Sequence, residues 1–412
     1  MILGGVVLSY TDVLTLLTFS ICFYLAIRKP QVNRRLVEVV FLLVFVIFVG
    51  VFRLTMDPPT AQVVSYSGNW DSYFRGNNSM MEAVSFSKQS VLQFIRAILF
   101  FFILMILKEN LEDDDWRDIL RKLVVSTRWM LPVYIIEAVL MLAHTNLFYV
   151  LRNRLFGGGF AIYDGRLSGL STEPSYYAIS LFFIIALNLL YEKEDDDKGK
   201  GLRIVTCAVY TILGLLSGAL SFLWTGTLIV LLYLVKNKGL TKKKLFGFLL
   251  LMPLLLFIST KSSYISLLSV EGMGFSNRIE NLFNSMINVI QSGVMKYSSE
   301  GTRMGSIIIL LKAWAERPLF GLGIGTTFCF SGLFSILSTV GVIGLVLWYI
   351  LIFHIYPNNK ADIVFNMIFL LVFLPAGDFE VFYGFNVVLW IELTSRLKLL
   401  YGQEEKSCCE KW

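Results

Sequence analysis

Residues 204–235 read IVTCAVYTILGLLSGALSFLWTGTLIVLLYLV, an apolar run without a charged side chain. A helix that crosses a membrane needs about 20 apolar residues, so this run is too long for one ordinary helix and short for two. Ser217 and Gly218 interrupt it near the middle, and both residue types favour turns. The stretch therefore predicts two apolar helices joined by a chain reversal within residues 216–221.

The distribution of basic residues along the chain supports this reversal. If the chain turns there, every strongly basic linker falls on one side of the membrane, and the segments on the other side are longer yet poorer in Lys and Arg. The basic linkers are residues 28–35, 108–122, 192–203, 236–245, 354–360 and 396–412. Because cytoplasmic loops carry this excess of positive charge, we expect a cytoplasmic C-terminus and an N-terminus on the outer side.

The composition excludes a water-soluble fold. Of the 412 residues, 56% are hydrophobic and 16% are charged, and the mean hydropathy is +0.68, whereas soluble domains carry about 25% charged residues. Apolar runs that suit membrane spans lie near residues 8–27, 36–52, 91–107, 123–143, 175–191, 204–217, 219–235, 246–260, 332–354, 362–376 and 383–399. The first run is too long and too weakly basic at its start for a cleaved signal peptide. We predict an all-α polytopic membrane protein, one integral membrane domain over residues 1–412 with about eleven transmembrane helices.

The remaining composition argues against several other classes of protein. The net charge of +6 follows mainly from the topological bias, so it gives no support for binding nucleic acid. Cys329 lies at a predicted outer membrane edge without a second outer cysteine, so we expect no disulfide there. The chain has only two histidines, and no structural metal site and no cofactor are expected.

Polar residues gather in three predicted outer segments, residues 53–90, 144–174 and 261–331. In the second, the sequence RLSGLSTEPSYYA begins at Arg166 and leads into a span. Pro174 suits the first position of a helix, whose free N–H groups can hold an anion. Arg166 adds a guanidinium that matches phosphate or carboxylate, and Glu173 places a carboxylate beside it. The alternative is that Arg166 and Glu173 only pair with each other and cap the helix.

The third outer segment, residues 261–331, is the longest of the three. After Arg303, residues 307–314 have a short helical pattern with an apolar face that suits the membrane surface. Pro318 and three alternate glycines, at positions 321, 323 and 325, then predict a turning backbone before the next span. These glycines do not predict a nucleotide site, because no Lys-Ser/Thr pair follows them and they face outward.

Several predicted spans contain charged residues, and each is a functional candidate because unpaired charge in hydrocarbon is costly. Those near span ends also have a structural alternative, in which they reach the interface or pair. The residues are Asp12, Glu38, Arg96, Arg128, Glu137 and Glu392.

Two stretches of the sequence, one in the second outer segment and one that begins in the third, resemble the O-antigen polymerase and ligase family of bacterial envelopes. The polymerases of this family are called Wzy-type. The first is the stretch Arg166-x-Ser-Gly-x-x-x-Glu173-Pro174-Ser175 before a span. The second is Arg303 followed by the pattern over residues 313–325, which opens into a span with Gly341, Ile343 and Gly344. The plan of many helices with two large extracytoplasmic loops, residues 144–174 and 261–331, extends the likeness to most of the chain.

The resemblance implies a GT-C-like membrane glycosyltransferase in the bacterial cytoplasmic (inner) membrane, with its active site on the outer, periplasmic side. It would join oligosaccharide repeat units carried on undecaprenyl diphosphate in the membrane lipid, transferring the growing chain to the non-reducing end of a new unit. Arg166 and Arg303 would hold the diphosphate, and Glu173 would act as a base or orient the arginines. Further contacts to diphosphate or glycan would come from Tyr176, Arg154 and Arg317. A copolymerase that regulates chain length is the partner that the family implies, and no metal is required.

Three other functions compete with a polymerase. Ligases of this family carry a histidine in the last large outer loop, and residues 261–331 contain none, which favours a polymerase. A lipid-linked oligosaccharide transporter or flippase would show two related halves and interrupted polar helices, and no internal repeat is evident. A structural membrane protein would tolerate replacement of Arg166, Glu173 and Arg303.

Overall fold

The computed structural model describes part of the chain, which forms two compact units. The described residues are 2–3, 6–7, 20, 24, 34–64, 81–110, 113–156, 166–169, 171, 174–191, 197–236, 284, 287, 291, 299–327, 329–353, 368, 371 and 372. The first unit spans Met1–Asp115, Ser285–Pro357 and Gly377–Glu392. The second spans Trp116–Asn284, Asn358–Ala376 and Leu393–Trp412.

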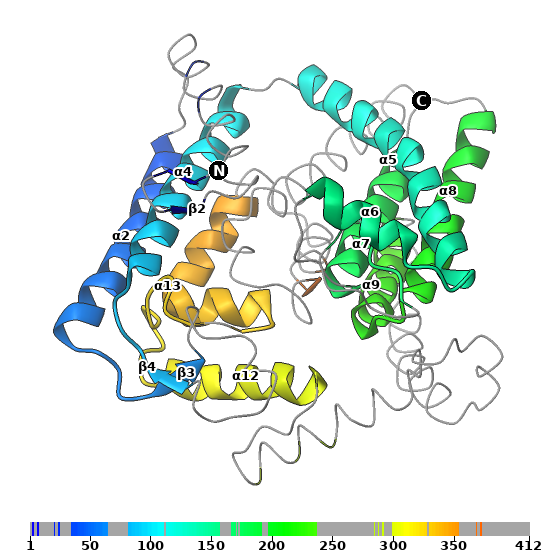
Figure 1. Cartoon of the computed structure of the whole chain (residues 1–412). Helices are drawn as coiled ribbons and strands as arrows, with labels where there is room; N and C mark the ends of the chain where they lie inside the picture. Colours follow the sequence, from blue (N-terminus) through cyan, green and yellow to red (C-terminus); the bar gives the residue numbers. More distant parts are fainter. Residues whose placement is uncertain are drawn as a thin grey trace. The chain divides into compact units, whose positions relative to one another are not determined.

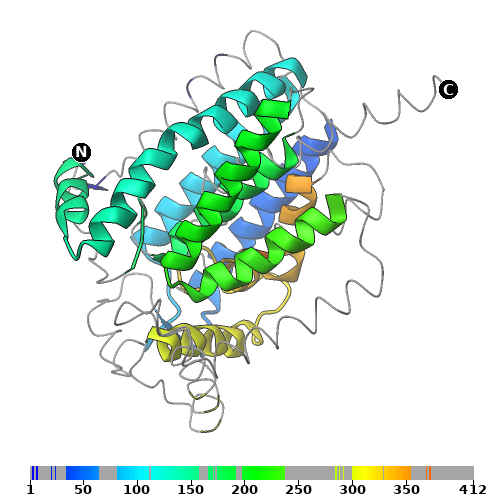
Figure 2. The ribbon, with the colours of Figure 1, turned by 90° about the vertical axis from the view of Figure 1, so that its right-hand side faces the viewer.

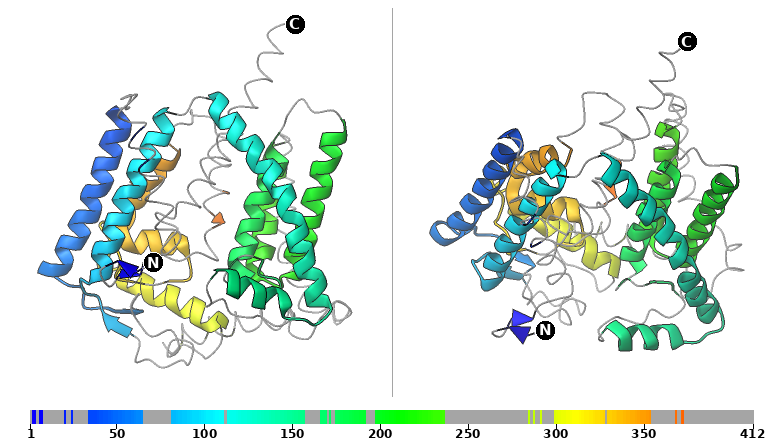
Figure 3. Two further views of the ribbon diagram at one scale, coloured as in Figure 1. Left: turned by 45° about the horizontal axis from the view of Figure 1, so that its top comes forward. Right: turned by 90° about the horizontal axis from the view of Figure 1, so that it is seen from above.

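The first unit is built around two long apolar helices. Helix α2 (Arg34–Met56) lies beside α4 (Lys88–Asn110) and packs extensively against α13 (Gly332–Phe353) (Figures 1 and 3). Helix α12 (Ser299–Trp314) lies at the bottom of the view in Figure 1, beside the β3–β4 hairpin, and runs in a different direction from α2 and α4. It contacts α13 and β3, which leaves it beside the segment that follows α2.

Two short hairpins complete the first unit. Strand β1 (Ile2–Leu3) pairs antiparallel with β2 (Val6–Val7). Strand β3 (Gln62–Val64) pairs antiparallel with β4 (Met81–Ala83), with Val63 opposite Glu82. Val63 and Val64 are buried, and Val63 joins a small apolar cluster with Leu310 of α12 and Cys329. The β3–β4 hairpin was not predicted from the sequence.

The second unit is a bundle around one central helix. Its helices are α5 (Asp113–Leu142), α6 (Leu147–Phe156), α7 (Pro174–Leu190), α8 (Asp197–Leu216) and α9 (Leu220–Lys236). Helix α7 packs against both α8 and α9 and is buried on nearly every side, as expected for a helix that is apolar all round. In Figure 2 these helices face the viewer, with α5 in teal and α8 and α9 in green.

The reversal predicted within residues 216–221 is confirmed. Helix α8 ends at Leu216, α9 begins at Leu220, and Ser217 and Gly218 form the turn between them. Gly218 has a positive φ of 58°, a conformation that glycine adopts without steric cost.

Seven of the predicted spans coincide with helices of the structure. These are residues 36–52 in α2, 91–107 in α4, 123–143 in α5, 175–191 in α7, 204–217 in α8, 219–235 in α9 and 332–354 in α13. The predicted spans at 246–260 and 383–399 lie outside the described residues, and those at 8–27 and 362–376 lie almost wholly outside them. Residues 307–314 are helical as predicted, within α12, whereas α6 was not predicted.

Three described helices are long and apolar enough to cross a membrane: Val37–Met56, Asp118–Leu142 and Gly332–Leu351. These helices support a mostly helical membrane protein. The third satisfies the criterion by length and composition, but its backbone is interrupted at Gly341, where φ is 69° and ψ is −172°. The predicted span 332–354 is therefore two helical halves rather than one continuous helix.

The break in α13 is closed by the loop that follows α12. On one side of the break, the carbonyls of Ser338 and Thr339 in α13 accept hydrogen bonds from the N–H groups of Leu322 (2.6 Å) and Gly323 (3.1 Å) in the loop. On the other side of the break, the N–H groups of residues 342 and 343 donate to the carbonyls of residues 318 and 319, at 2.9 and 3.2 Å. Four backbone groups that a kink would leave unpaired are thus satisfied, as the interior of a membrane protein requires.

Replacement of Gly341 by alanine should destabilise the protein. An added Cβ would lie 2.2 Å from the carbonyl oxygen of Leu319, and the backbone conformation is nearly restricted to glycine, at a cost of about 1–3 kcal/mol. The matched control is Gly226→Ala in α9, where an added Cβ meets no atom within 4 Å and should stabilise the helix by up to about 1 kcal/mol. Thermal unfolding in detergent measures both, and equal stability of Gly341→Ala and the parent would contradict the break.

Candidate functional site

In the second unit, Arg166 lies at the turn between α8 and α9. Its Nε donates to the carbonyl oxygen of Ser217 at 3.1 Å, and its Nη2 lies 3.5 Å from that of Gly218. The end of a helix presents unpaired carbonyls and a partial negative charge, both of which suit a guanidinium. The turn predicted from the sequence therefore anchors the arginine that the sequence singled out.

The residues that follow Arg166 are held by Glu137 of α5, which is fully buried. One oxygen of this carboxylate, Oε1, accepts the backbone N–H groups of Ser168 and Gly169, both at 2.9 Å. Gly169 has a φ of 58°, and an added Cβ would lie 2.7 Å from the ring of Tyr177. Only glycine fits this position, so Glu137 meets a backbone whose conformation is tightly restricted.

Two side chains of α6 complete this support. Arg152 is buried, and its Nη1 donates to Ser168 Oγ, Gly169 O and Ser171 O at 2.8, 2.9 and 3.1 Å. Tyr149 donates its hydroxyl to the carbonyl of Arg166 at 2.7 Å and also lies 3.3 Å from Glu137 Oε1. The guanidinium of Arg152 stacks 5.1 Å from the Tyr149 ring centre.

The other candidates of this unit lie around the same connection. Pro174 is the first residue of α7, as predicted, and Tyr176 follows in its first turn, half-buried. Arg154 is exposed near the end of α6. Glu173 lies outside the described residues, so the pairing of Arg166 with Glu173 stays a prediction.

In the first unit, Arg303 projects from the first half of α12. Its guanidinium lies 5.3 Å from the ring centre of Phe330, within the range of a cation–π contact. Ser306 links the same two places, since its hydroxyl donates to Arg303 O at 2.8 Å and lies 3.5 Å from the N–H of Phe330. Arg303 is thus fixed against the loop that leads into α13.

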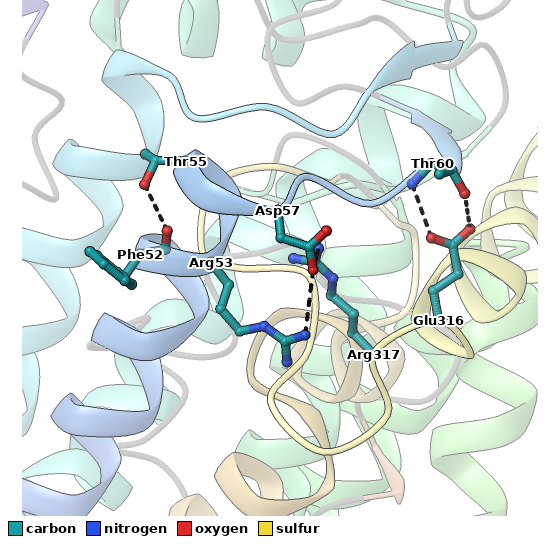
Figure 4. A network of polar contacts seen from close by, with 7 residues as sticks. All are labelled: Phe52, Arg53, Thr55, Asp57, Thr60, Glu316 and Arg317. Carbon is teal, nitrogen blue, oxygen red and sulfur yellow. Dashed lines mark hydrogen bonds and ion pairs between the residues drawn. The ribbon is translucent and has the colours of Figure 1, made fainter.

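A second polar cluster lies at the other end of α12 (Figure 4). Arg317 is buried, and its Nη2 is 3.1 Å from Asp57 Oδ2, which is also 3.7 Å from Nη2 of Arg53. Glu316 accepts both the N–H and the hydroxyl of Thr60, each at 3.0 Å. Burial lowers the pKa of the Arg317 guanidinium, and the nearby Asp57 carboxylate opposes this shift. The cluster holds residues 57–60 to the end of α12.

The predicted site residues are divided between the two units of the structure. Arg303 and Arg317 belong to the same unit, but about 16 Å of helix separates Arg303 from the end of α12 at Trp314. Arg303 contacts Phe330, whereas Arg317 pairs with Asp57. Arg166, Arg154 and Tyr176 belong to the other unit.

Sequence reasoning missed the residues that support the candidates. Tyr149 and Arg152 are three positions apart, so they share one face of α6, a helix that was not predicted. Asp57 and Glu316 were not singled out either. The only sequence signal for this network was a charged residue inside an apolar span. It identified Glu137 as a candidate but did not identify the residues that Glu137 contacts.

The fold and its apolar helices define a mostly helical membrane protein. Comparisons of the chain with family models, with curated proteins and with solved structures found no match.

The burial of Cys329 allows a test of the packing between α12 and the loop that leads into α13. The residue is 1% exposed, and burial raises the pKa of its thiol to about 12. Since the thiolate is the reactive form, a maleimide should label Cys329 at pH 7 about a thousandfold more slowly than an ordinary cysteine. A variant that keeps only this cysteine measures the rate before and after denaturation. Lys312→Cys, on an exposed position of α12, is the control in a cysteine-free background, and comparable rates for both would contradict the packing around Cys329.

Proposed function

We propose that this chain is a Wzy-type membrane glycosyltransferase that polymerises oligosaccharide repeat units carried on undecaprenyl diphosphate. About eleven transmembrane helices, a GT-C-like architecture and an active site on the outer face of a bacterial cytoplasmic membrane belong to this proposal. The observation that carries it is the fixed segment of residues 166–169, which presents a cation shortly before α7 begins at Pro174.

The main catalytic requirement of the proposed reaction is positive charge that stabilises the leaving diphosphate. A hydroxyl of the acceptor repeat unit attacks the anomeric carbon of the donor, and the bond from that carbon to the diphosphate oxygen breaks. The bonding electrons leave with undecaprenyl diphosphate, and the hydroxyl proton passes to Glu173 acting as base. Arg166 stabilises the charge that develops on the leaving oxygen.

The other candidates receive distinct roles. Arg303 is proposed as the second cation, because its contact with Phe330 fixes the guanidinium in place. Tyr176 and Arg154, on either side of the Arg166 segment in the sequence, are proposed to contact the glycan. Arg317 is buried and paired with Asp57, which supports a role in holding residues 57–60 more than a contact with substrate.

A transporter of lipid-linked oligosaccharide is the second candidate, because helix α13 is interrupted at Gly341. Transporters place substrate and ion sites at such discontinuous helices. Here the loop before α13 already occupies the freed backbone groups at the break. These groups are not available to a substrate, which favours the polymerase.

The decisive experiment is polymerisation by the purified protein in liposomes supplied with undecaprenyl-diphosphate repeat units. Loss of one preorganised cation costs roughly a hundred- to thousandfold in rate, so Arg166→Ala and Arg303→Ala should each abolish the visible glycan ladder. Glu173→Gln should slow the reaction strongly if the carboxylate is the base.

Matched controls separate this loss from damage to the fold. Arg121→Ala removes a cation that pairs with exposed Asp118 near the start of α5. Lys312→Ala removes an exposed cation on the same helix as Arg303. Both should keep the ladder. The absence of a ladder from the parent protein, or unchanged ladders in all variants, would overturn the polymerase and direct the test to transport of the lipid-linked unit across the same liposomes.

A further inference from the structure

The two oxygens of the buried Glu137 carboxylate differ in their hydrogen bonds. Oε1 accepts the adjacent N–H groups of Ser168 and Gly169 and lies within reach of the Tyr149 hydroxyl. Oε2 is buried and has no hydrogen-bond partner among the described residues. A carboxylate in hydrocarbon is costly, and this one uses a single oxygen to bind backbone of the segment that begins at Arg166.

We propose that Glu137 is a positioning residue for Arg166, acting through Oε1 and with the help of Tyr149. This inference rests on the proposed glycosyltransferase function, in which Arg166 meets the diphosphate. Glu137 itself touches no reacting atom. It fixes the amides at positions 168 and 169, while Tyr149 fixes the carbonyl of Arg166 itself.

The contacts on either side of Arg166 explain why such support is needed. The guanidinium is held by carbonyls of the α8–α9 turn, and the backbone is held by side chains of α5 and α6. A shift of about 1 Å in a group that positions a reacting centre can cost roughly a hundredfold in rate. The arginine is therefore only as well placed as the two sets of contacts that hold it.

The proposal depends on the position of one acceptor oxygen rather than on negative charge. Arg152, the nearest cation of the network, donates from Nη1 to the neutral oxygens of Ser168, Gly169 and Ser171. Glutamine keeps an acceptor at the place of Oε1 and loses the charge. Aspartate keeps the charge and withdraws the acceptor by one methylene group.

The test compares Glu137→Gln, Glu137→Asp and Tyr149→Phe by kcat in the polymerisation assay. Glu137→Gln should stay within about threefold of the parent, because a neutral acceptor replaces a charged one. Glu137→Asp should lose roughly a hundredfold through misplacement of the segment. Tyr149→Phe, which changes only one hydroxyl, should lose about two- to tenfold. Higher activity in the aspartate variant than in the glutamine variant would overturn the proposal.

A double-mutant cycle distinguishes positioning from a general effect on the fold. In an Arg166→Ala background, Glu137→Asp should change the residual rate by less than about twofold, because its effect passes through the missing side chain. Full additivity of the two losses would refute the proposed route. Glu82→Asp and Tyr233→Phe are the controls, since Glu82 is exposed on β4 and Tyr233 is exposed on α9.

A readout without catalysis keeps this inference separate from the proposed function. Hydrogen exchange of peptides covering residues 166–171 should be faster in Glu137→Asp and unchanged in Glu137→Gln, relative to a peptide from α4. If the parent makes no polymer, the proposed function fails, and the exchange pattern still decides whether Glu137 holds the segment. Equal exchange in parent and aspartate variants would overturn the positioning role.

Discussion

The constraint on which this structure depends is the absence of water from the hydrocarbon core of a bilayer. Every backbone N–H and C=O there must find a partner inside the protein, which restricts the chain to helices and to irregular segments covered by protein. Helix α13 shows how strict this rule is. Its break at Gly341 exposes backbone groups on both sides, and residues 318–323 pair with them one by one. The glycines of this loop allow that approach, since a Cβ at Gly321 would lie 2.6 Å from the backbone of α13.

The segment that begins at Arg166 is largely buried in protein, and its backbone groups find their partners by a different route. Here side chains rather than backbone supply the partners: a carboxylate takes two amides, a guanidinium takes two carbonyls, and a phenol takes one. Backbone held in this way does not need a helical conformation. The chain can therefore place Arg166 outside a helix and still keep it in a defined position, which is what binding of an anion requires.

Local signals were enough to predict some of these features, and non-local contacts explain the rest. The turn at Ser217 and Gly218, the start of α7 at Pro174 and most described spans follow from residue types within a few positions. The break in α13 does not, because the backbone groups that pair with it come from residues 318–323, in the loop before the helix. The role of Glu137 was also hidden, since its partners at Ser168 and Gly169 come from another segment. Arg303 was identified as a candidate, but its separation from Arg317 required the length of α12.

Four arginines in the predicted outer segments carry a cost that argues for a role in the fold or in function. Membrane proteins place Lys and Arg preferentially on the cytoplasmic side, and this chain does so strongly. Arg152, Arg166, Arg303 and Arg317 lie in segments predicted to face the opposite side, where they contribute nothing to orientation. Arg152 and Arg317 are also buried, which adds a desolvation cost, and the ion pair with Asp57 offsets part of that cost for Arg317. Arg152 in turn holds the segment of Arg166, and Arg303 is fixed by Phe330. The contacts of Arg152 and Arg317 serve the fold, whereas the anion-binding role proposed for Arg166 and Arg303 would give the chain a reason to keep these two charges in its predicted outer segments.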